Sequence, residues 1–212
     1  MAIRESNIGR ILALGDLEKG QLERLKKLRD IGWEFISGGK AAKSLREIGI
    51  DYTKHSDDYI PELNGHPMLN FKILSGILAD CESLQDMEKI SDLDIEMIDI
   101  VLINFQKTAN FACSKDNPRV KDIDTCLFSY LIAAVQNSKY VNIITDPSDC
   151  SLVVREILAF GKTSLITRGM LVQKALDMLA TNFKFIADVA RYRSKTGQPI
   201  FTGPNETDFY TV

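Results

Sequence analysis

The chain has 212 residues, of which 45% are hydrophobic and 26% are charged. This is the ordinary composition of a globular protein, and it excludes the fibrous and disordered classes. With 26 basic and 29 acidic residues the formal charge is −3, so the composition gives no sign of the basic surface that nucleic-acid binding needs. The length suits one domain, which we expect at 1–193, followed by a tail at 194–212.

The first fifty residues alternate between short apolar runs and amphipathic segments. We predict buried strands at 10–14 and 33–36 and helices at 17–30 and 40–48. A third, weaker strand is expected at 50–53. Alternation of this kind predicts a parallel sheet in which each helix crosses over between two strands.

The rest of the chain continues the pattern after a polar loop at 54–65. The strongest strand signal is at 97–104, and another strand is expected at 140–145. Further helices are expected at 80–90, 119–138, 147–160 and 163–192. The predicted class is α/β: a three-layer, doubly wound and mostly parallel sheet of about five strands, with a C-terminal helical extension.

The cysteines and histidines indicate a reduced protein without a metal. The four cysteines share no short spacing: Cys81, Cys113, Cys126 and Cys150. Such scattered thiols predict free cysteines and a cytoplasmic location. His55 and His66 are the only histidines, so we expect no metal. No apolar run approaches the ~18 residues of a membrane span, so no membrane partner is expected.

A turn after the second strand is the sharpest local signal. Ser37-Gly38-Gly39-Lys40 combines two glycines, a hydroxyl and a charge at the start of a helix. Backbone N–H groups at a helix N-terminus attract anions, so this turn predicts a phosphate site. The alternative is an ordinary turn that caps the helix. Lys19 and Lys72 are weaker candidates, because a lone lysine is usually a solvated surface charge.

Several segments resemble the inosine monophosphate (IMP) cyclohydrolase domain, which is the N-terminal half of the bifunctional purine-biosynthesis enzyme. Phe35-Ile36-Ser37-Gly38-Gly39-Lys40 resembles the family's strand and S-T-G-G-T-A turn, and Ser75-Gly76-Ile77-Leu78-Ala79 resembles its G-I-L-A segment. Further similar segments lie at 60–63, 98–104, 122–124 and 167–175. The resemblance covers residues 9–192 and implies a methylglyoxal-synthase-like fold. The transformylase half of the family enzyme is absent from this sequence.

The resemblance implies a reaction and a set of site residues. The family closes the pyrimidine ring of a 5-formamidoimidazole-4-carboxamide ribotide with loss of water, and it needs no cofactor. The implied catalytic residues are Asp124, which would orient the amide or take its proton, and Lys72 or His66, which would stabilise the oxyanion. The implied substrate- and phosphate-binding residues are Lys19, Ser37, Gly38, Gly39, Lys40, Asn104 and Thr125.

Departures from the family pattern leave other functions open. The family's S-D-K-T-G loop is Asp16-Leu17-Glu18-Lys19-Gly20 here, and the glycine pair after its aspartate is Thr125-Cys126. A family lysine is replaced by Gln136, which cannot carry a charge. One alternative is a catalytically degenerate domain that binds or senses a phosphoribosyl ligand. Another is a subunit that completes its site with a partner chain. Asp124 itself also fits a plain helix-start residue.

The expected partners are a ribotide or nucleotide monophosphate and a second copy of the chain. The stretch at 171–189 is apolar on more than one side of its predicted helix. A helix that packs only on its own sheet needs a single apolar stripe. The surplus, together with the dimers of the resembled family, predicts a homodimer interface on this helix.

Overall fold

The computed structural model describes residues 8–54, 62–63, 66–67, 69–104 and 124–196, without side chains at 62–63, 66–67 and 189. Its main sheet has five strands in the order β3-β2-β1-β6-β7. The strands are β1 (Arg10–Gly15), β2 (Glu34–Ser37), β3 (Thr53–Lys54), β6 (Ile100–Asn104) and β7 (Asn142–Ile144). Every neighbouring pair is parallel, which confirms the predicted sheet.

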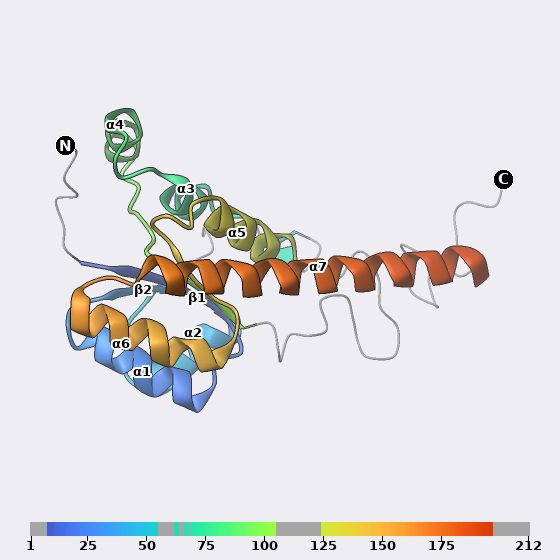
Figure 1. Cartoon of the computed structure of the whole chain (residues 1–212), viewed down its shortest axis with the longest axis horizontal. Helices are drawn as coiled ribbons and strands as arrows, with labels where there is room; N and C mark the ends of the chain where they lie inside the picture. Colours follow the sequence, from blue (N-terminus) through green and yellow to red (C-terminus); the bar gives the residue numbers. More distant parts are fainter. Residues whose placement is uncertain (1–7, 55–61, 64–65, 68, 105–123, 197–212) are drawn as a thin grey trace.

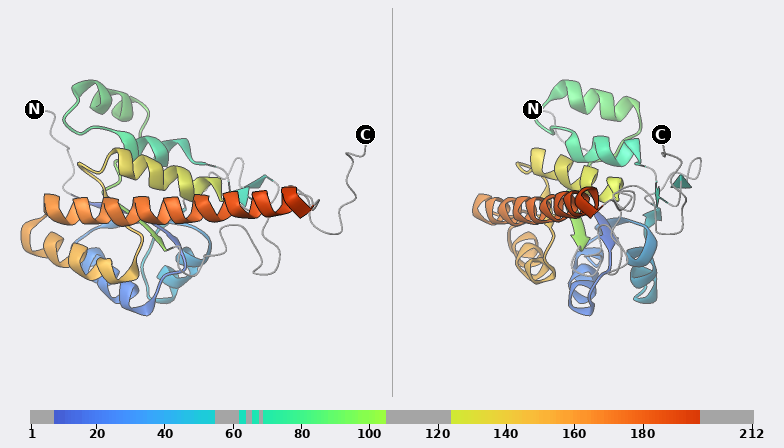
Figure 2. Two further views of the ribbon diagram at one scale, coloured as in Figure 1. Left: turned by 45° about the vertical axis from the view of Figure 1, so that its right-hand side comes forward. Right: turned by 90° about the vertical axis from the view of Figure 1, so that its right-hand side faces the viewer.

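Helices cover both faces of the sheet and make three layers (Figures 1 and 2). The first face carries α1 (Lys19–Arg29), α2 (Gly39–Glu47) and α6 (Cys150–Phe160), with a 3₁₀ turn (Pro147–Asp149) before α6. The second face carries α3 (Phe71–Leu78), α5 (Thr125–Gln136) and α7 (Leu165–Thr196). Helix α4 (Leu84–Asp92) lies beyond α3, away from the sheet (Figure 2).

Strand β1 is the centre of the hydrophobic core. Ile11, Leu12 and Ala13 are completely buried, because β2 and β6 flank the strand and helices cover both of its faces. Its side chains alternate between the two core clusters, with Leu12 on the α5 side and Ile11 on the α1 side. A strand buried on both faces has to be a continuous apolar run, which is why the sequence reveals it.

Two parts of the sequence prediction differ from the structure. The third strand lies at Thr53–Lys54, later than the 50–53 expected. A second, two-stranded antiparallel sheet, β4 (Glu62–Leu63) with β5 (His66–Pro67), falls in and just after the segment predicted as a loop. Strands this short carry no alternation that a sequence pattern could detect. The predicted loop at 105–118 and the start of the helix at 119–138 lie outside the described residues.

Helix α7 is longer than the sheet that it covers. Its 32 residues span about 48 Å, whereas the six residues of β1 span about 20 Å. Its first half packs on the core through Leu171, Ala175 and Leu179, and its second half projects past the domain (Figure 1). The helix continues to Thr196, beyond the domain boundary expected at 193. None of the described helices is long and apolar enough to cross a membrane.

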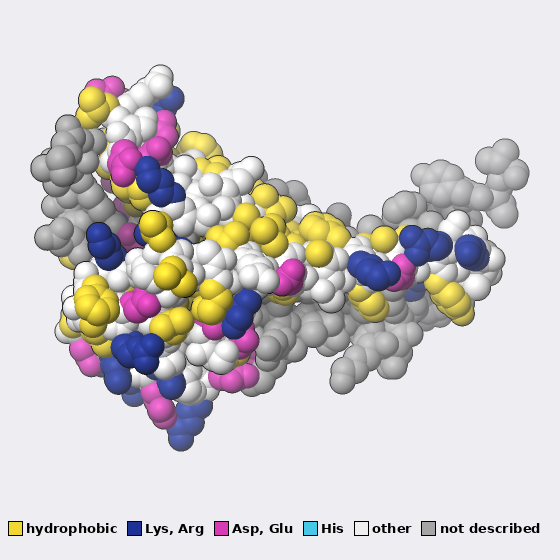
Figure 3. Space-filling view, viewed as in Figure 1, with side chains coloured by type: hydrophobic (Ala, Val, Ile, Leu, Met, Phe, Trp, Pro, Cys, Tyr) yellow, Lys and Arg dark blue, Asp and Glu magenta, His cyan; other side chains and the backbone are white. Residues whose placement is uncertain are grey.

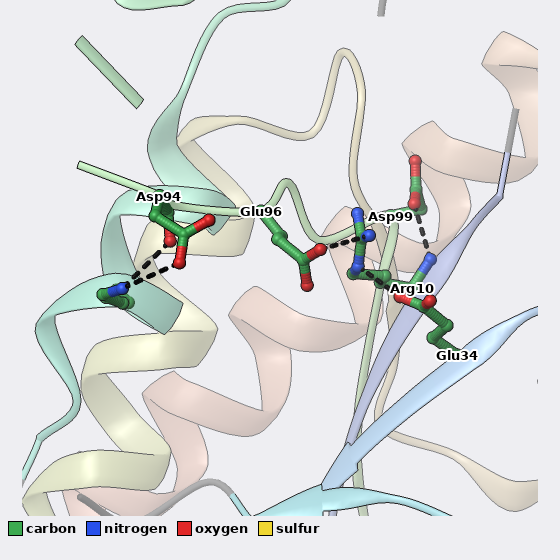
Figure 4. A network of polar contacts seen from close by, with 6 residues as sticks. Arg10, Glu34, Asp94, Glu96 and Asp99 are labelled. Atoms are coloured by element: carbon green, nitrogen blue, oxygen red, sulfur yellow. Dashed lines mark hydrogen bonds and ion pairs between the residues drawn. The ribbon is translucent and has the colours of Figure 1, made fainter. Parts of the chain in front are cut away.

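A buried arginine joins three segments at the amino edge of the sheet (Figure 4). Nε of Arg10 lies 2.6 Å from the Glu34 carboxylate, and its Nη2 donates to Glu96 at 2.6 Å. The backbone N–H of Arg10 donates to Oδ2 of Asp99 at 2.7 Å. These contacts bind the starts of β1 and β2 to the segment that leads into β6, so they fix the stagger of the three strands.

Gly76 permits the close packing of α3 against the segment before β6. A Cβ atom on Gly76 would lie 2.1 Å from the backbone oxygen of Glu96, whereas a Cβ on Gly169 of α7 would meet nothing within 4 Å. We therefore expect Gly76→Ala to destabilise the protein by about 1–3 kcal/mol through overpacking. The same change at Gly169 should stabilise it by about 0.5–1 kcal/mol, because alanine favours a helix. Urea unfolding of both variants checks this, and equal effects at the two positions would contradict the packing.

Candidate functional site

The strand order reverses between β1 and β6, so the connections that leave their carboxyl ends run to opposite sides. From β1 the chain proceeds to β2 and β3 on one side, and β6 and β7 lie on the other. Ligands of open parallel sheets bind at such a reversal. Gly15 pairs there with Asn104, and its φ is +87°. A Cβ on Gly15 would lie 2.6 Å from the Asn104 backbone oxygen, so only glycine fits this position.

Two buried amides join the loop after β1 to the end of β6. Nδ2 of Asn104 donates to the Asp16 backbone oxygen at 2.5 Å and to Oε1 of Gln21 at 3.4 Å. The same Oε1 accepts the backbone N–H of Glu18 at 2.9 Å. Asn104 and Gln21 are each 1% exposed. The predicted site residue Asn104 therefore lies at the reversal, and its side chain holds the loop that follows β1.

Gln21 is a polar residue of this region that the sequence prediction missed. Its Oε1 receives both hydrogen bonds, whereas its Nε2 has no partner among the described residues. A buried donor without a partner costs about 1–3 kcal/mol. The available signal was a glutamine at an inward position of α1, whose other buried side chains are Leu25 and Leu28.

The turn at 37–40 supplies backbone donors at the start of α2. Gly38 is the N-cap residue, and no side chain caps this helix. The first N–H groups of α2 consequently have no partner within the helix, as at any helix start. Nζ of Lys40 lies 3.8 Å from Oδ2 of Asp16, and the lysine side chain is mostly exposed. The glycine turn and Lys40 are thus placed as an anion site needs.

The hydroxyl of Ser37 is used inside the sheet. It donates to the backbone oxygen of Ala13 at 2.7 Å, and Ser37 is completely buried. The hydroxyl proton thus joins β1 to β2, so Ser37 supports the turn instead of donating to an anion. Lys19, at the start of α1, is exposed but follows Glu18, the N-cap residue of that helix. An acid beside each helix start opposes a second negative charge: Glu18 at α1, and Asp16, next to Lys40, at α2.

Asp124 and Thr125 begin α5 at the same edge of the sheet, since a crossover helix runs antiparallel to its strands. Oδ1 of Asp124 accepts the backbone N–H of Leu127 at 3.0 Å. Asp124 is therefore an N-cap residue, which is the structural alternative weighed from the sequence. Thr125 is the first residue of α5 and is exposed.

Lys72 points to a different part of the fold from Asp124. Its Nζ donates to the Asp94 backbone oxygen at 3.0 Å and lies 3.6 Å from the Asp94 carboxylate (Figure 4). Asp94 stands two residues before Glu96, in the segment that leads to the amino end of β6. The lysine thus lies away from the carboxyl edge. The backbone of His66 is in β5, and its side chain lies outside the described residues.

An ion pair after β7 anchors α7 near the candidate site. Nζ of Lys174 donates to Oδ1 and Oδ2 of Asp149 at 2.7 and 2.8 Å and lies 3.6 Å from Asp146. The hydrogen bond from Asp149 raises the pKa of Lys174, and the backbone N–H of Ser148 lowers the pKa of Asp146. The lysine and Asp146 therefore stay charged at neutral pH. The contact fixes the first half of α7 to the loop that follows β7.

None of the three described cysteines is in a disulfide: Cys81, Cys126 and Cys150. Burial raises the pKa of Cys126 to about 11 and that of Cys150 to about 12. Thiols of such high pKa are protonated at neutral pH and are poor nucleophiles. The described residues contain no cluster of three or more His, Cys, Asp or Glu side chains that could hold a metal ion. Cys113 lies outside them.

Together these features define a doubly wound parallel α/β domain whose candidate ligand site is the reversal between β1 and β6. No family model matches the chain. It is 36% identical over 176 residues to the bifunctional purine biosynthesis protein PurH of Persephonella marina, covering 80% of this chain and 34% of that protein. It is 34% identical over 196 residues to PurH of Caldicellulosiruptor saccharolyticus, covering 89% of this chain and 38% of that protein.

The chain is homologous to the N-terminal region of PurH, the IMP cyclohydrolase and methylglyoxal-synthase-like domain. It spans about one third of the length of these relatives. The crystal structure of ForH has the same fold, with a TM-score of 0.71 over 86% of this chain and 96% of that chain, at 20% sequence identity. The resemblance stated from the sequence is thereby confirmed.

The glycine turn of α2 can be tested with IMP or inorganic phosphate. A ligand at about 100 times its dissociation constant stabilises a protein by about 2.7 kcal/mol, so either probe should raise the melting temperature. Gly38 has an extended φ of −155°, which valine also adopts, so Gly38→Val should fold. Its side chain would block the backbone donors and abolish the shift. Gly169→Val, in open space on α7, is the matched control and should keep it. A full rise in melting temperature in Gly38→Val would show that the anion does not bind at this turn.

Proposed function

We propose that the protein closes the pyrimidine ring of a 5-formamidoimidazole-4-carboxamide ribotide and forms IMP. The carrying observation is the homology to the N-terminal region of PurH, a protein of purine biosynthesis, over most of this chain. The open turn of α2 at the carboxyl edge supports the proposal, because it offers a place for a ribotide phosphate. The protonated thiols of the described cysteines support a cytoplasmic location for this reaction.

The reaction joins two groups of one substrate. The carboxamide nitrogen attacks the formyl carbon, and a carbon–nitrogen bond forms. The formyl oxygen then leaves as water with one proton from the carboxamide nitrogen and one from the formamide nitrogen. The protein's task is to hold the two groups close and to move protons, since positioning alone supplies several kcal/mol. Gly38, Gly39 and Lys40 would hold the phosphate, with Lys19 on the neighbouring helix, and Asn104 and Thr125 would border the base.

Asp124 is the proposed proton acceptor. Its cap to Leu127 uses Oδ1, and a carboxylate has further acceptor capacity on its second oxygen. One carboxylate can therefore start α5 and still accept a proton or hydrogen bond from the carboxamide. Two residues were expected to stabilise the oxyanion, Lys72 and His66. Lys72 pairs with Asp94 away from the carboxyl edge, so this role would fall to His66.

Binding without catalysis is the second candidate function. It is favoured by the buried hydroxyl of Ser37 and by Gln136, an exposed amide where the family has a lysine. A sensor domain needs the phosphate turn but not the proton-transfer groups. A site completed by a partner chain would explain the same losses. Turnover of the formylated ribotide separates the first function from both alternatives.

Asp124→Asn tests the catalytic role without disturbing the helix start, since asparagine caps a helix as well as aspartate does. We expect ribotide binding to stay within a few-fold and turnover to fall by ~100-fold or more, the usual scale of one acid–base group. Absorbance assays of IMP formation measure both variants under single-turnover conditions. Asp146→Asn is the control, because the Asp146 side chain also caps a helical turn, and this variant should keep its turnover rate. Normal turnover in Asp124→Asn would reduce Asp124 to a structural residue.

We further propose that the protein acts as a homodimer through α7. Two large apolar side chains on the solvent side of this helix are 86% and 47% exposed: Ile166 and Leu176. Phe183, which is 47% exposed, lies at the margin of this side, where its ring packs on Phe128 of α5 with the ring centroids 4.9 Å apart. The exposed positions 169, 173, 180 and 187 continue the same line at intervals of three and four residues. A second copy of the chain would cover this apolar line, because apolar residues at intervals of three and four pack against a partner helix in coiled coils.

Leu176→Glu should break the homodimer, because it places a charge in the middle of the apolar line. Light scattering with size-exclusion chromatography should give twice the chain mass of 23.8 kDa for the unmodified protein and the single mass for the variant. Thr181→Glu is the control. Thr181 follows Leu176 by five residues, which turn the helix by about 140°, so it lies off the apolar line. A monomeric unmodified protein at micromolar concentration would exclude this interface.

A further inference from the structure

A second cavity lies at the amino edge of the sheet, and none of the residues proposed for the ribotide chemistry lines it. The amino-edge cavity measures about 210 Å³. A larger groove of about 570 Å³ lies elsewhere, between α1 and α6.

 The amino-edge cavity is formed where the chain enters its strands: Trp33 directly precedes β2, Asp99 precedes β6, and Asn142 begins β7. The turn between α6 and α7 contributes Lys162, and the first turn of α7 contributes Arg168.

We propose that this amino-edge cavity binds a small planar monoanion, an aromatic carboxylate, at a site separate from the carboxyl edge. The proposal does not depend on the proposed ribotide chemistry. It rests on the size of the cavity, on the charges that line it and on its aromatic walls.

The size of the cavity sets the size of the ligand. A water molecule occupies about 30 Å³ of the liquid, so 210 Å³ corresponds to about seven waters. That is below the roughly 300–1,000 Å³ of sites that hold drug-sized ligands. A single six-membered ring with one charged substituent suits this space, and a nucleotide does not.

The lining charges favour one negative charge. Lys162 and Arg168 contribute two positive charges and Asp99 one negative charge, so the lining carries 2 − 1 = +1. Oδ2 of Asp99 already accepts the backbone N–H of Arg10 at 2.7 Å. The C-terminus of α6 and the N-terminus of α7 also meet at this turn, and their helix dipoles have opposite signs, so they offset each other. The net attraction is therefore for a monoanion.

Arg168 has a hydrogen-bond donor to spare. Its Nη1 donates to the backbone oxygen of Lys139, which fixes the guanidinium, whereas its buried Nε has no partner among the described residues. A guanidinium presents its donors in a planar fork that matches a carboxylate. The buried Nε would reach an anion in the cavity only after a small turn of the guanidinium.

The aromatic walls favour a planar ring. Trp33 packs tightly on Gly9, where a Cβ would lie 2.4 Å from the indole, so the indole is held in place. Tyr140 contributes a second aromatic side chain to the lining. Such walls offer apolar contact and ring–ring attraction to a flat ligand.

The chain's single tryptophan makes the proposal testable, because Trp33 lines this cavity. Intrinsic fluorescence should change saturably on titration with benzoate, with a dissociation constant of about 1 mM or below, as expected for so small a ligand. Benzamide, which is planar but neutral, should bind at least tenfold more weakly. Cyclohexanecarboxylate, which is charged but not planar, should also bind more weakly.

Arg168→Gln should weaken benzoate binding at least tenfold. Lys162→Gln, at an exposed position, provides a second test should the first variant fail to fold by circular dichroism. Arg155→Gln, on the outer side of α6 in the other groove, is the matched control and should bind normally. IMP should not compete with benzoate.

Three results would overturn the proposal. The first is the absence of a saturable benzoate signal in the unmodified protein. The second is equal binding of benzoate and benzamide, or unchanged binding in the folded variants at Arg168 and Lys162. The third is displacement of benzoate by IMP, which would place it at the carboxyl edge. The activity of the protein on a ribotide enters none of these outcomes.

Discussion

The burial of β1 between β2 and β6 is the constraint on which the candidate site depends. Ile11, Leu12 and Ala13 lose all contact with water, and burying such side chains is the main favourable term in folding. Only a parallel arrangement with helices on both faces covers such a strand. The carboxyl ends of β1, β2 and β6 then meet at one edge, with the loop of Asp16, the turn of Gly38 and the side chain of Asn104 as neighbours.

Polar contacts at the two ends of the sheet hold this arrangement in register. At the amino edge, the buried Arg10 is paired with Glu34 and Glu96, which come from different segments. At the carboxyl edge, Lys174 holds Asp149 and ties α7 to the loop after β7. Breaking such a pair costs more than a surface pair does, because a buried charge is left without its partner. The candidate site is thus carried by a sheet whose amino and carboxyl edges are both held by ion pairs.

Much of the fold could be predicted from the sequence, because the core strands are continuous apolar runs and the helices are amphipathic. The runs at 10–14 and 97–104 became β1 and β6, and the parallel sheet followed from their alternation with helices. The two-residue strands β4 and β5 could not be predicted, since pairs so short depend on tertiary contacts.

The site could be predicted in part. The turn at 37–40 could be proposed from its two glycines at the start of a helix, whereas Asn104 came from the family resemblance. Sequence spacing could not show that the Ser37 hydroxyl bonds to Ala13, or that Lys72 turns to Asp94, since both depend on the neighbouring segment and not on local pattern. Gln21 was missed for the same reason: its role comes from Asn104, 83 residues away in sequence.

The central claim is that a ribotide binds at the carboxyl edge, with its phosphate on the start of α2. Hydrogen–deuterium exchange with and without IMP tests this most directly, because a bound phosphate slows exchange of the amides that it contacts. The account predicts protection of the amides at 38–41, with the groove between α1 and α6 unchanged. Protection confined to that groove or to the amino edge, or no protection at saturating IMP, would contradict it.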